Sequence, residues 1–194
     1  MAQRIGLFGG TFDPVHNGHI SIAESFLQSG LIDELWVLLT PFPPHKQETH
    51  HTPYEMRLRL IQTAFEGIPN LSIKTIENRL PKPSYSVQTI RHLKGEYPDS
   101  TFYYCMGEDS LAYFHTWKYY TEILEECDLL VAKRPGVSHD EVEDQILKST
   151  HFVSHTPLEI SSSSIKERVQ NGDSIAELVP KSVHKIIEKE QLYS

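Results

Sequence analysis

The hydrophobic residues of this chain follow two patterns that alternate along the sequence. Apolar runs, continuous or alternating, predict six strands, over residues 4–8, 34–39, 71–76, 101–106, 128–132 and 151–155. Apolar residues that recur every three or four positions predict helices over residues 20–30, 111–126 and 141–148, the second with a break near 115–117. Further helices are predicted to begin at about residues 52, 86 and 161 and after residue 180. Thr52, followed by Pro53 and Glu55, is the predicted N-cap of the second helix, and Ser86 that of the third.

The alternation of strands and helices predicts an α/β fold with a doubly wound, mostly parallel sheet and right-handed crossovers. No repeat, low-complexity stretch or interdomain linker interrupts the pattern. We therefore expect one domain over residues 1–194, with a C-terminal helical part over about 157–194. In such sheets ligands bind beyond the carboxyl ends of the strands, so residues that follow predicted strands are the first candidates for a site.

Composition narrows the class of protein. With 194 residues and 39% hydrophobic content, the chain has enough apolar material for a packed core. Its formal net charge of −8 argues against a general nucleic-acid binder, which needs a broad basic surface. No leader segment and no apolar run of membrane-spanning length occurs, so we expect a cytoplasmic protein that does not bind a membrane. Cys105 and Cys127 are expected to be buried thiols rather than a disulfide.

Residues Gly9–His19, which we call the glycine loop, join the first strand to the first helix and read Gly-Gly-Thr-Phe-Asp-Pro-Val-His-Asn-Gly-His. A tight turn followed by a helix start directs backbone N–H groups toward one point, where a phosphate would bind. His16 and His19 are three residues apart and reach the same ligand if the helix has begun by then. The loop is neither a dinucleotide fingerprint nor a P-loop. A purely structural turn and a zinc site are alternatives, although zinc needs further ligands and no Cys-x-x-Cys occurs.

Other unusual segments also follow predicted strands and should converge on the same edge of the sheet: Pro41–Lys46, Gly107–Asp109 and Lys133–Gly136. Lys46 could clamp a phosphate or be an ordinary surface lysine. The serines at 161–164 could bind an anion with hydroxyl and N–H groups, or only cap a helix.

Two aromatic segments add candidate ligand contacts. Trp117 could stack on a flat ligand or pack in the core. Ser84-Tyr85-Ser86 could donate hydrogen bonds to a carboxylate or cap the following helix. No nucleophile with an adjacent base stands out. Glycines, histidines, lysines and helix starts suit phosphoryl or nucleotidyl transfer, in which the protein positions the reactants and stabilises charge.

The glycine loop closely resembles the Gly-Gly-(Ser/Thr)-Phe-Asp-Pro-(Ile/Val)-His-x-Gly-His signature of the His-x-Gly-His nucleotidyltransferases. Residues 160–166, Ile-Ser-Ser-Ser-Ser-Ile-Lys, resemble the second signature of that superfamily, Ile-Ser-Ser-Thr-x-Ile-Arg. Ser163 replaces Thr, and Lys166 replaces Arg, which loses bidentate geometry toward phosphates. The chain resembles bacterial nicotinate-nucleotide adenylyltransferases over nearly its whole length, also through residues 43–46, 83–86, 107–111 and 133–136.

The resemblance implies a Rossmann-like nucleotidyltransferase fold and the transfer of an adenylyl group from ATP to nicotinate mononucleotide. The implied products are nicotinate adenine dinucleotide (deamido-NAD) and pyrophosphate, a step of NAD biosynthesis. Mg²⁺ is the implied cofactor, held by the phosphates and not by a protein metal site. The implied catalytic residues are His16, His19 and Lys46. The implied ATP-binding residues are Gly9, Gly10, Thr11, Phe12, His16, His19, Gly107, Asp109, Ile160, Ser161, Ser162, Ser163 and Lys166. The implied nicotinate mononucleotide-binding residues are Lys46, Ser84, Tyr85, Ser86, Asp109, Trp117 and Arg134.

Two alternative functions stay open at this point. Pantetheine-phosphate adenylyltransferases are similar at the first signature, but they are shorter and typically have Thr at the position of His16. A non-catalytic nucleotide-binding protein on the same fold belongs to another class, and the intact His16 and His19 argue against it. The expected partners are the small molecules ATP and nicotinate mononucleotide, without nucleic acid or membrane. A homo-oligomer is compatible with the sequence.

Overall fold

The computed structural model describes residues 2–41, 51–134 and 136–194. Its strands form one six-stranded sheet in the order β3-β2-β1-β4-β5-β6, and every neighbouring pair is parallel. The strands are β1 (Arg4–Gly10), β2 (Glu34–Leu39), β3 (Leu71–Lys74), β4 (Thr101–Gly107), β5 (Asp128–Ala132) and β6 (Thr150–Val153). The predicted doubly wound parallel sheet is confirmed.

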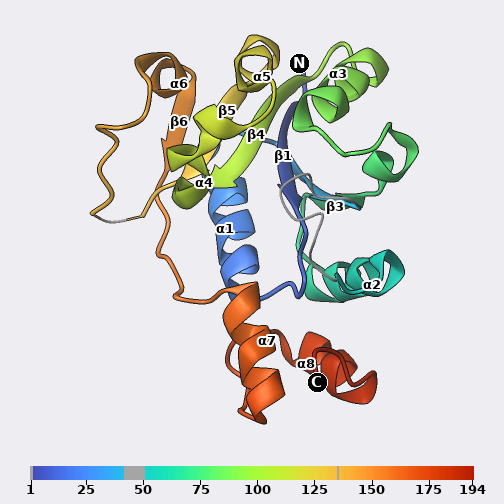
Figure 1. The fold of residues 1–194 in the computed structure, drawn as a ribbon. Coiled ribbons are helices and arrows are strands. Elements are labelled where there is room, and N and C mark those ends of the chain that lie inside the picture. Colours follow the sequence, from blue (N-terminus) through green and yellow to red (C-terminus); the bar gives the residue numbers. More distant parts are fainter. Residues whose placement is uncertain (1, 42–50, 135) are drawn as a thin grey trace.

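Helices lie on both sides of the sheet, and two more lie beyond it near the C-terminus (Figure 1). They are α1 (Asn17–Gln28), α2 (Tyr54–Ala64), α3 (Ser86–Glu96), α4 (Glu108–Ala112), α5 (Tyr120–Glu126), α6 (Asp144–Lys148), α7 (Ser162–Asn171) and α8 (Lys181–Lys189), with the 3₁₀ turns η2 (Ile76–Arg79) and η3 (Phe114–Thr116). Figure 1 shows α7 and α8 next to one another, with α7 beyond the lower end of α1 and α8 below α2. The predicted C-terminal helices are thus confirmed.

The four inner strands, β1, β2, β4 and β5, each contribute side chains to two hydrophobic cores, one on either face of the sheet. In β2, Leu35, Val37 and Leu39 belong to the first core, whereas Trp36 and Leu38 belong to the second. Helices α1, α2, α7 and α8 contribute to the first core, and α3, α5 and α6 contribute to the second. Burial on both faces explains why the strands appear in the sequence as continuous apolar runs.

Two predicted helix caps are wrong, because tertiary partners have taken the groups concerned. Helix α2 has Pro53 at its N-cap, and the backbone N–H of Thr52 donates to Asp13 at 3.3 Å. Ser86 is the first residue of α3 rather than its N-cap, and its hydroxyl donates to the Tyr104 hydroxyl at 3.0 Å. Groups that can cap a helix can also form tertiary hydrogen bonds, and a local sequence pattern does not show which of the two they form.

Several other boundaries differ by a few residues. Helix α1 begins at Asn17, three residues earlier than predicted, which makes His16 its N-cap. The strand predicted over 71–76 ends at Lys74, because η2 begins two residues later. The break predicted near 115–117 is confirmed by η3, and Ser161 caps α7 by accepting the N–H of Ser164 at 3.0 Å.

The strand order reverses between β1 and β4, the two central strands. The connections that leave their carboxyl ends therefore run to opposite faces of the sheet, and the space between them is the expected position of a ligand crevice in this fold. Cys105 and Cys127 are free thiols without a disulfide and only 1% and 8% exposed, as predicted. None of the described helices has the length and apolar content needed to cross a membrane.

Candidate active site

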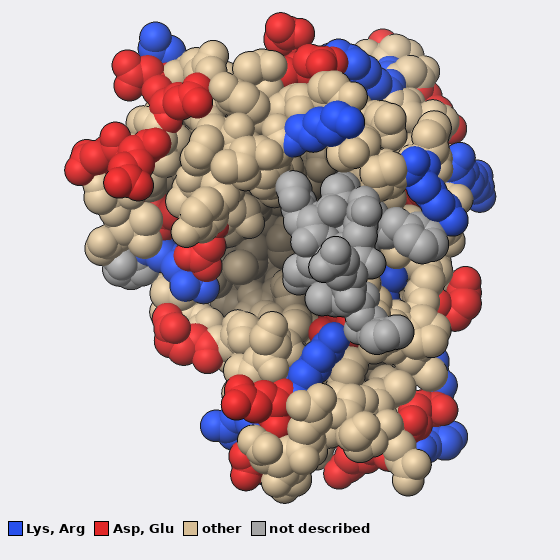
Figure 2. Space-filling view, in the orientation of Figure 1, with Lys and Arg blue, Asp and Glu red and all other residues tan. Residues whose placement is uncertain are grey.

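A cavity of about 430 Å³ opens at the carboxyl ends of β1 and β4, where the strand order reverses. Many residues predicted from the sequence line it: Gly9, Gly10, Thr11, His19, Ser84, Tyr85, Ser86, Gly107, Asp109 and Trp117. Figure 2 shows a hollow in this face of the molecule, whose visible wall is mainly uncharged. Residues expected to contact two different substrates thus meet in one cavity.

The start of the glycine loop requires glycine because an aromatic ring lies directly against it. A Cβ atom on Gly10 would lie 2.8 Å from Cζ of Phe12, a distance at which the ring would have to move. Phe12 has a left-handed backbone (φ 47°) and is 2% exposed, and its ring meets His19 edge-on at a centroid distance of 4.9 Å. Phe12 therefore supports His19 from the core, and its side chain does not line the cavity.

The two histidines lie side by side at the start of α1. Their ring centroids are 3.7 Å apart, and the backbone N–H of His16 donates to Nδ1 of His19 at 3.2 Å. Because Nδ1 of His19 accepts this bond, the proton of the neutral ring resides on Nε2. His19, which lines the cavity, is therefore a hydrogen-bond donor at Nε2.

His16 is buried behind this wall, with 7% exposure. Burial lowers the pKa of His16 to about 4, so its ring is neutral at pH 7. Its Nδ1 has no hydrogen-bond partner among the described residues. A Cβ atom on Gly18 would lie only 3.0 Å from this nitrogen, so glycine leaves space for the ring. Over residues 2–41, 51–134 and 136–194, no three His, Cys, Asp or Glu side chains group to hold a metal ion.

Trp117 and the start of α3 contribute a second part of the lining. The Trp117 ring meets the Tyr104 ring edge-on at 5.7 Å and tilts against Phe114 at 5.4 Å. Ser84 is 8% exposed, and its hydroxyl oxygen has no hydrogen-bond partner in the described part of the chain. Trp117 thus packs against the core and borders the cavity at the same time, and stacking on a flat ligand stays a prediction.

Some lining residues were not singled out from the sequence: Thr40, Tyr104, Glu77 and Lys118. Nζ of Lys118 lies 4.7 Å from the centroid of the Tyr85 ring and 3.5 Å from its hydroxyl, which places a cation beside the aromatic wall. Lys118 directly follows Trp117, a predicted ligand contact, and this position in the sequence could have identified it. Glu77 is 5% exposed, and burial raises its pKa despite hydrogen bonds from threonine hydroxyls. No local pattern marks Glu77.

The segment after β5 is tied to the start of α4 by two acidic residues. Asp109, which lines the cavity, pairs with Arg134 (Nη2–Oδ2 3.2 Å). Glu108 is 1% exposed, accepts the backbone N–H of Arg134 and pairs with His139 (Oε1–Nε2 2.5 Å). Arg134 does not line the cavity itself but fixes the carboxylate that does.

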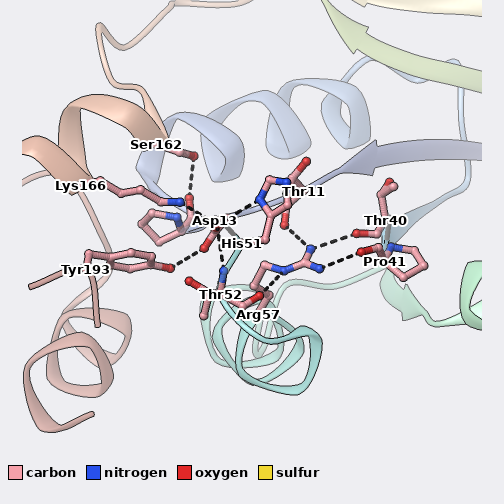
Figure 3. Close-up of polar contacts among 11 residues, drawn as sticks. Thr11, Asp13, Thr40, Pro41, His51, Thr52, Arg57, Ser162, Lys166 and Tyr193 are labelled. Atoms are coloured by element: carbon pink, nitrogen blue, oxygen red, sulfur yellow. Dashed lines mark hydrogen bonds and ion pairs between the residues drawn. The ribbon is translucent and has the colours of Figure 1, made fainter. Parts of the chain in front are cut away.

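The second signature lies beside the glycine loop and not in the cavity lining. Ser162 donates to the carbonyl of Pro14 at 2.9 Å, and Nζ of Lys166 lies 2.6 Å from Oδ2 of Asp13 (Figure 3). Burial would raise the pKa of Asp13, but hydrogen bonds, led by that from Lys166, hold it at about 2. None of Ile160, Ser161, Ser162, Ser163 and Lys166 is among the lining residues.

A buried arginine joins the loops that follow β1 and β2. Arg57 is 1% exposed and donates to the backbone carbonyls of Thr11, Thr40 and Thr52, each at 2.9 Å, and of Pro41 at 3.3 Å (Figure 3). Burial lowers its pKa, an effect that the Asp13 carboxylate opposes. Lys46, the third predicted catalytic residue, lies outside the described residues.

The chain is similar to known proteins over most of its length. A family model described as cytidylyltransferase-like matches residues 7–168. A protein of Geobacillus thermodenitrificans named "Probable nicotinate-nucleotide adenylyltransferase" is 40% identical over 190 residues, covering 98% of this chain and 86% of the relative. A protein of the same name from Flavobacterium psychrophilum is 35% identical over 193 residues, covering 98% of this chain and 99% of the relative.

Solved structures give the same fold. Plasmodium falciparum nicotinic acid mononucleotide adenylyltransferase complexed with NaAD superposes with a TM-score of 0.83 at 18% sequence identity. The superposition covers 98% of this chain and 97% of that structure. The same protein complexed with APC gives a TM-score of 0.81 over the same shares of both chains.

Proposed function

The chain belongs to the cytidylyltransferase-like family and, through its full-length relatives, to the nicotinate-nucleotide adenylyltransferases, and from this premise we propose the reaction that its cavity supports. A 5′-phosphate oxygen of nicotinate mononucleotide attacks the α-phosphorus of ATP. The bond from that phosphorus to the α–β bridging oxygen breaks, and pyrophosphate leaves. The observation that most directly supports the proposal is the position of the glycine loop. It forms a wall of the cavity where the strand order reverses, and Trp117 lines the same cavity.

On the ATP side, the backbone of Gly9, Gly10 and Thr11 is proposed to approach the phosphates closely. His19 donates from Nε2, and His16 supports its ring from behind. Because burial holds His16 neutral, we assign the pair to hydrogen bonding and charge stabilisation and not to proton abstraction. Such a role needs fixed donors aimed at developing charge, which a helix N-terminus with two packed rings supplies.

Further ATP contacts are proposed from the family resemblance. Gly107 and Asp109 border the ribose or base, and the Asp109 carboxylate is held by Arg134. The start of α7, with Ser161–Ser163, is proposed to lie toward the ATP phosphates from beside the glycine loop, and Lys166 is proposed to act there through its contact with Asp13. Phe12 and Ile160 contribute through packing, since both belong to the first hydrophobic core or lie against it.

We propose Mg²⁺ as the cofactor, bound through the phosphates of ATP. The described cavity residues suit this arrangement, because they offer N–H donors and only separate carboxylates, Glu77 and Asp109. Mg²⁺ commonly keeps several waters and binds through substrate phosphates instead of an all-protein cage. When bound, it would neutralise part of the charge that develops on the departing pyrophosphate.

On the mononucleotide side, the nicotinate ring is proposed to stack on Trp117. Ser84, Tyr85 and Ser86 at the start of α3 offer backbone and hydroxyl donors to the carboxylate. Lys118 adds a cation at this end of the cavity, so recognition of the acid need not rest on dipoles alone. Lys46 remains a predicted phosphate contact from the sequence.

The test is a pyrophosphate-release assay with purified protein and Mg²⁺-ATP. We expect release with nicotinate mononucleotide and much slower release with nicotinamide mononucleotide. Absence of pyrophosphate with both mononucleotides would overturn the function. Equal rates with the two would overturn the carboxylate pocket alone, and turnover of phosphopantetheine instead would favour the sister family.

A further inference from the structure

Asp13, in the middle of the glycine loop, receives hydrogen bonds from three distant parts of the chain. Oδ1 accepts the Tyr193 hydroxyl at 2.9 Å, and Oδ2 accepts Nζ of Lys166 at 2.6 Å and the backbone N–H of Thr52 at 3.3 Å. Nδ1 of His51 lies 3.4 Å from Oδ2. Figure 3 shows these groups around one carboxylate, which is 4% exposed and does not line the cavity. The carboxylate therefore has a role other than direct ligand contact.

Tyr193, which donates to this carboxylate, has an unusual backbone conformation. Its backbone is left-handed (φ 71°), which costs a non-glycine residue on the order of 1 kcal/mol. Burial raises the pKa of its hydroxyl, so the group stays protonated and donates. Nζ of Lys166 lies 5.1 Å from the centroid of the Tyr193 ring, so the two donors to Asp13 also contact each other.

The C-terminal segment holds the glycine loop on both sides of His16. Before it, Asp13 is bound by Tyr193 and Lys166, and the Pro14 carbonyl is bound by Ser162. After it, the backbone N–H of Asn17 donates to the carbonyl of residue 178 at 2.9 Å, and the side-chain amide donates to the carbonyl of residue 177 at 3.0 Å. The orientation of His16, and through it of His19, is thus set by residues far away in sequence.

We propose that Tyr193 is a positioning residue for adenylyl transfer. Through Asp13 it holds the glycine loop so that His19, supported from behind by His16, faces the position where charge develops on the phosphates. The inference rests on the proposed function. Misplacement of a reacting group by about 1 Å costs on the order of 10²-fold in rate, so a partly loosened loop should cost about ten-fold. The loss should fall on kcat, because Tyr193 and Asp13 do not line the cavity in which the substrates bind.

The test compares Tyr193→Phe with the matched variant Tyr97→Phe in full-length protein. Tyr97 is 41% exposed, packs edge-on against Trp36 at 5.0 Å and does not line the cavity. We expect kcat to fall about ten-fold in Tyr193→Phe, with KM for ATP and for nicotinate mononucleotide within about two-fold of wild type, and no change in Tyr97→Phe. All assays are run at a temperature at which circular dichroism shows every variant to be folded.

A double-mutant cycle with Asp13→Asn separates positioning from general stability. If Tyr193 acts through Asp13, the double variant should have nearly the kcat of Asp13→Asn alone. Wild-type kcat in Tyr193→Phe, or additive losses in the double variant, would overturn the inference while leaving the proposed function intact. An inactive wild-type protein would overturn the proposed function and with it the basis of this inference.

Discussion

Replacing Arg57 with Met should destabilise the protein strongly, because the buried guanidinium joins the loops that follow β1 and β2. Three of its four hydrogen bonds to backbone carbonyls are 2.9 Å long. Hydrogen bonds to a charged group contribute about 1.5–3 kcal/mol each, so the three amount to roughly 5–9 kcal/mol before any offset. Methionine offers an apolar stem of similar length but no donor.

Part of this loss is offset, since the variant no longer has to desolvate a guanidinium ion, which costs several kcal/mol. The carbonyls of Thr11, Thr40 and Thr52, which are half-buried, and that of Pro41, which is buried, lose this donor in Arg57→Met, which adds to the destabilisation. We therefore expect a net loss of about 3–5 kcal/mol, which is the hydrogen-bond contribution less the desolvation offset. Small domains are stable by about 5–15 kcal/mol in total, so the effect should be large.

Urea unfolding followed by circular dichroism measures the loss as a shift of the midpoint at an unchanged slope. The matched control is Arg59→Met, two residues further along α2. Its side chain is 49% exposed and pairs with Glu190 at 3.0 Å, so its removal should cost less than about 1 kcal/mol. A loss below about 1 kcal/mol in Arg57→Met, or the same loss in both variants, would refute the assigned role of the buried guanidinium.

The remaining predictions concern catalysis, substrate choice and pH. His19→Ala should lower kcat on the order of 10²-fold, the loss typical of removing one transition-state donor, and near-wild-type turnover would refute that role. Lys118→Met should raise KM for nicotinate mononucleotide several-fold but not for nicotinamide mononucleotide, and an unchanged ratio would contradict the carboxylate contact. The pKa of Asp13 is lowered from 3.8 to about 2, so its ionised form contributes about 2 kcal/mol of stability above pH 4 that is lost as pH falls toward 2. Asp13→Asn should remove this acid-dependent part in urea unfolding at pH 6 and pH 3, and equal pH dependence in both proteins would argue against it.

Strand positions could be predicted because burial on both faces leaves a strong signal in the sequence. The run Glu34–Leu39 was predicted as a strand from its apolar content, and β2 covers the same residues. Helix starts were less predictable, because a cap depends on which group the polar side chain or N–H finally reaches. The N–H of Thr52 reaches Asp13, thirty-nine residues earlier, and the hydroxyl of Ser86 reaches Tyr104. These partners are distant in sequence and leave no local pattern.

The candidate site was predictable where one local segment carries it. The glycine loop places His16 and His19 against each other because they are the N-cap and the third residue of one helix. Burial of His16 was not predictable, since it depends on packing from other elements. Lys166 was assigned to ATP by resemblance, whereas the structure pairs it with Asp13, a contact across 153 residues. Glu77 was missed because only the folded sheet brings it to the cavity.

The two buried cysteines make the protein a convenient subject for site-specific labelling. Maleimides react with the thiolate form, and burial raises the pKa of both Cys105 and Cys127, that of Cys127 to about 12. The chain has no other cysteine. In a Val137→Cys variant, the new thiol would occupy a position that is 38% exposed, three residues from Arg134. A dye attached there would report on the segment that holds Asp109 without prior removal of the native cysteines.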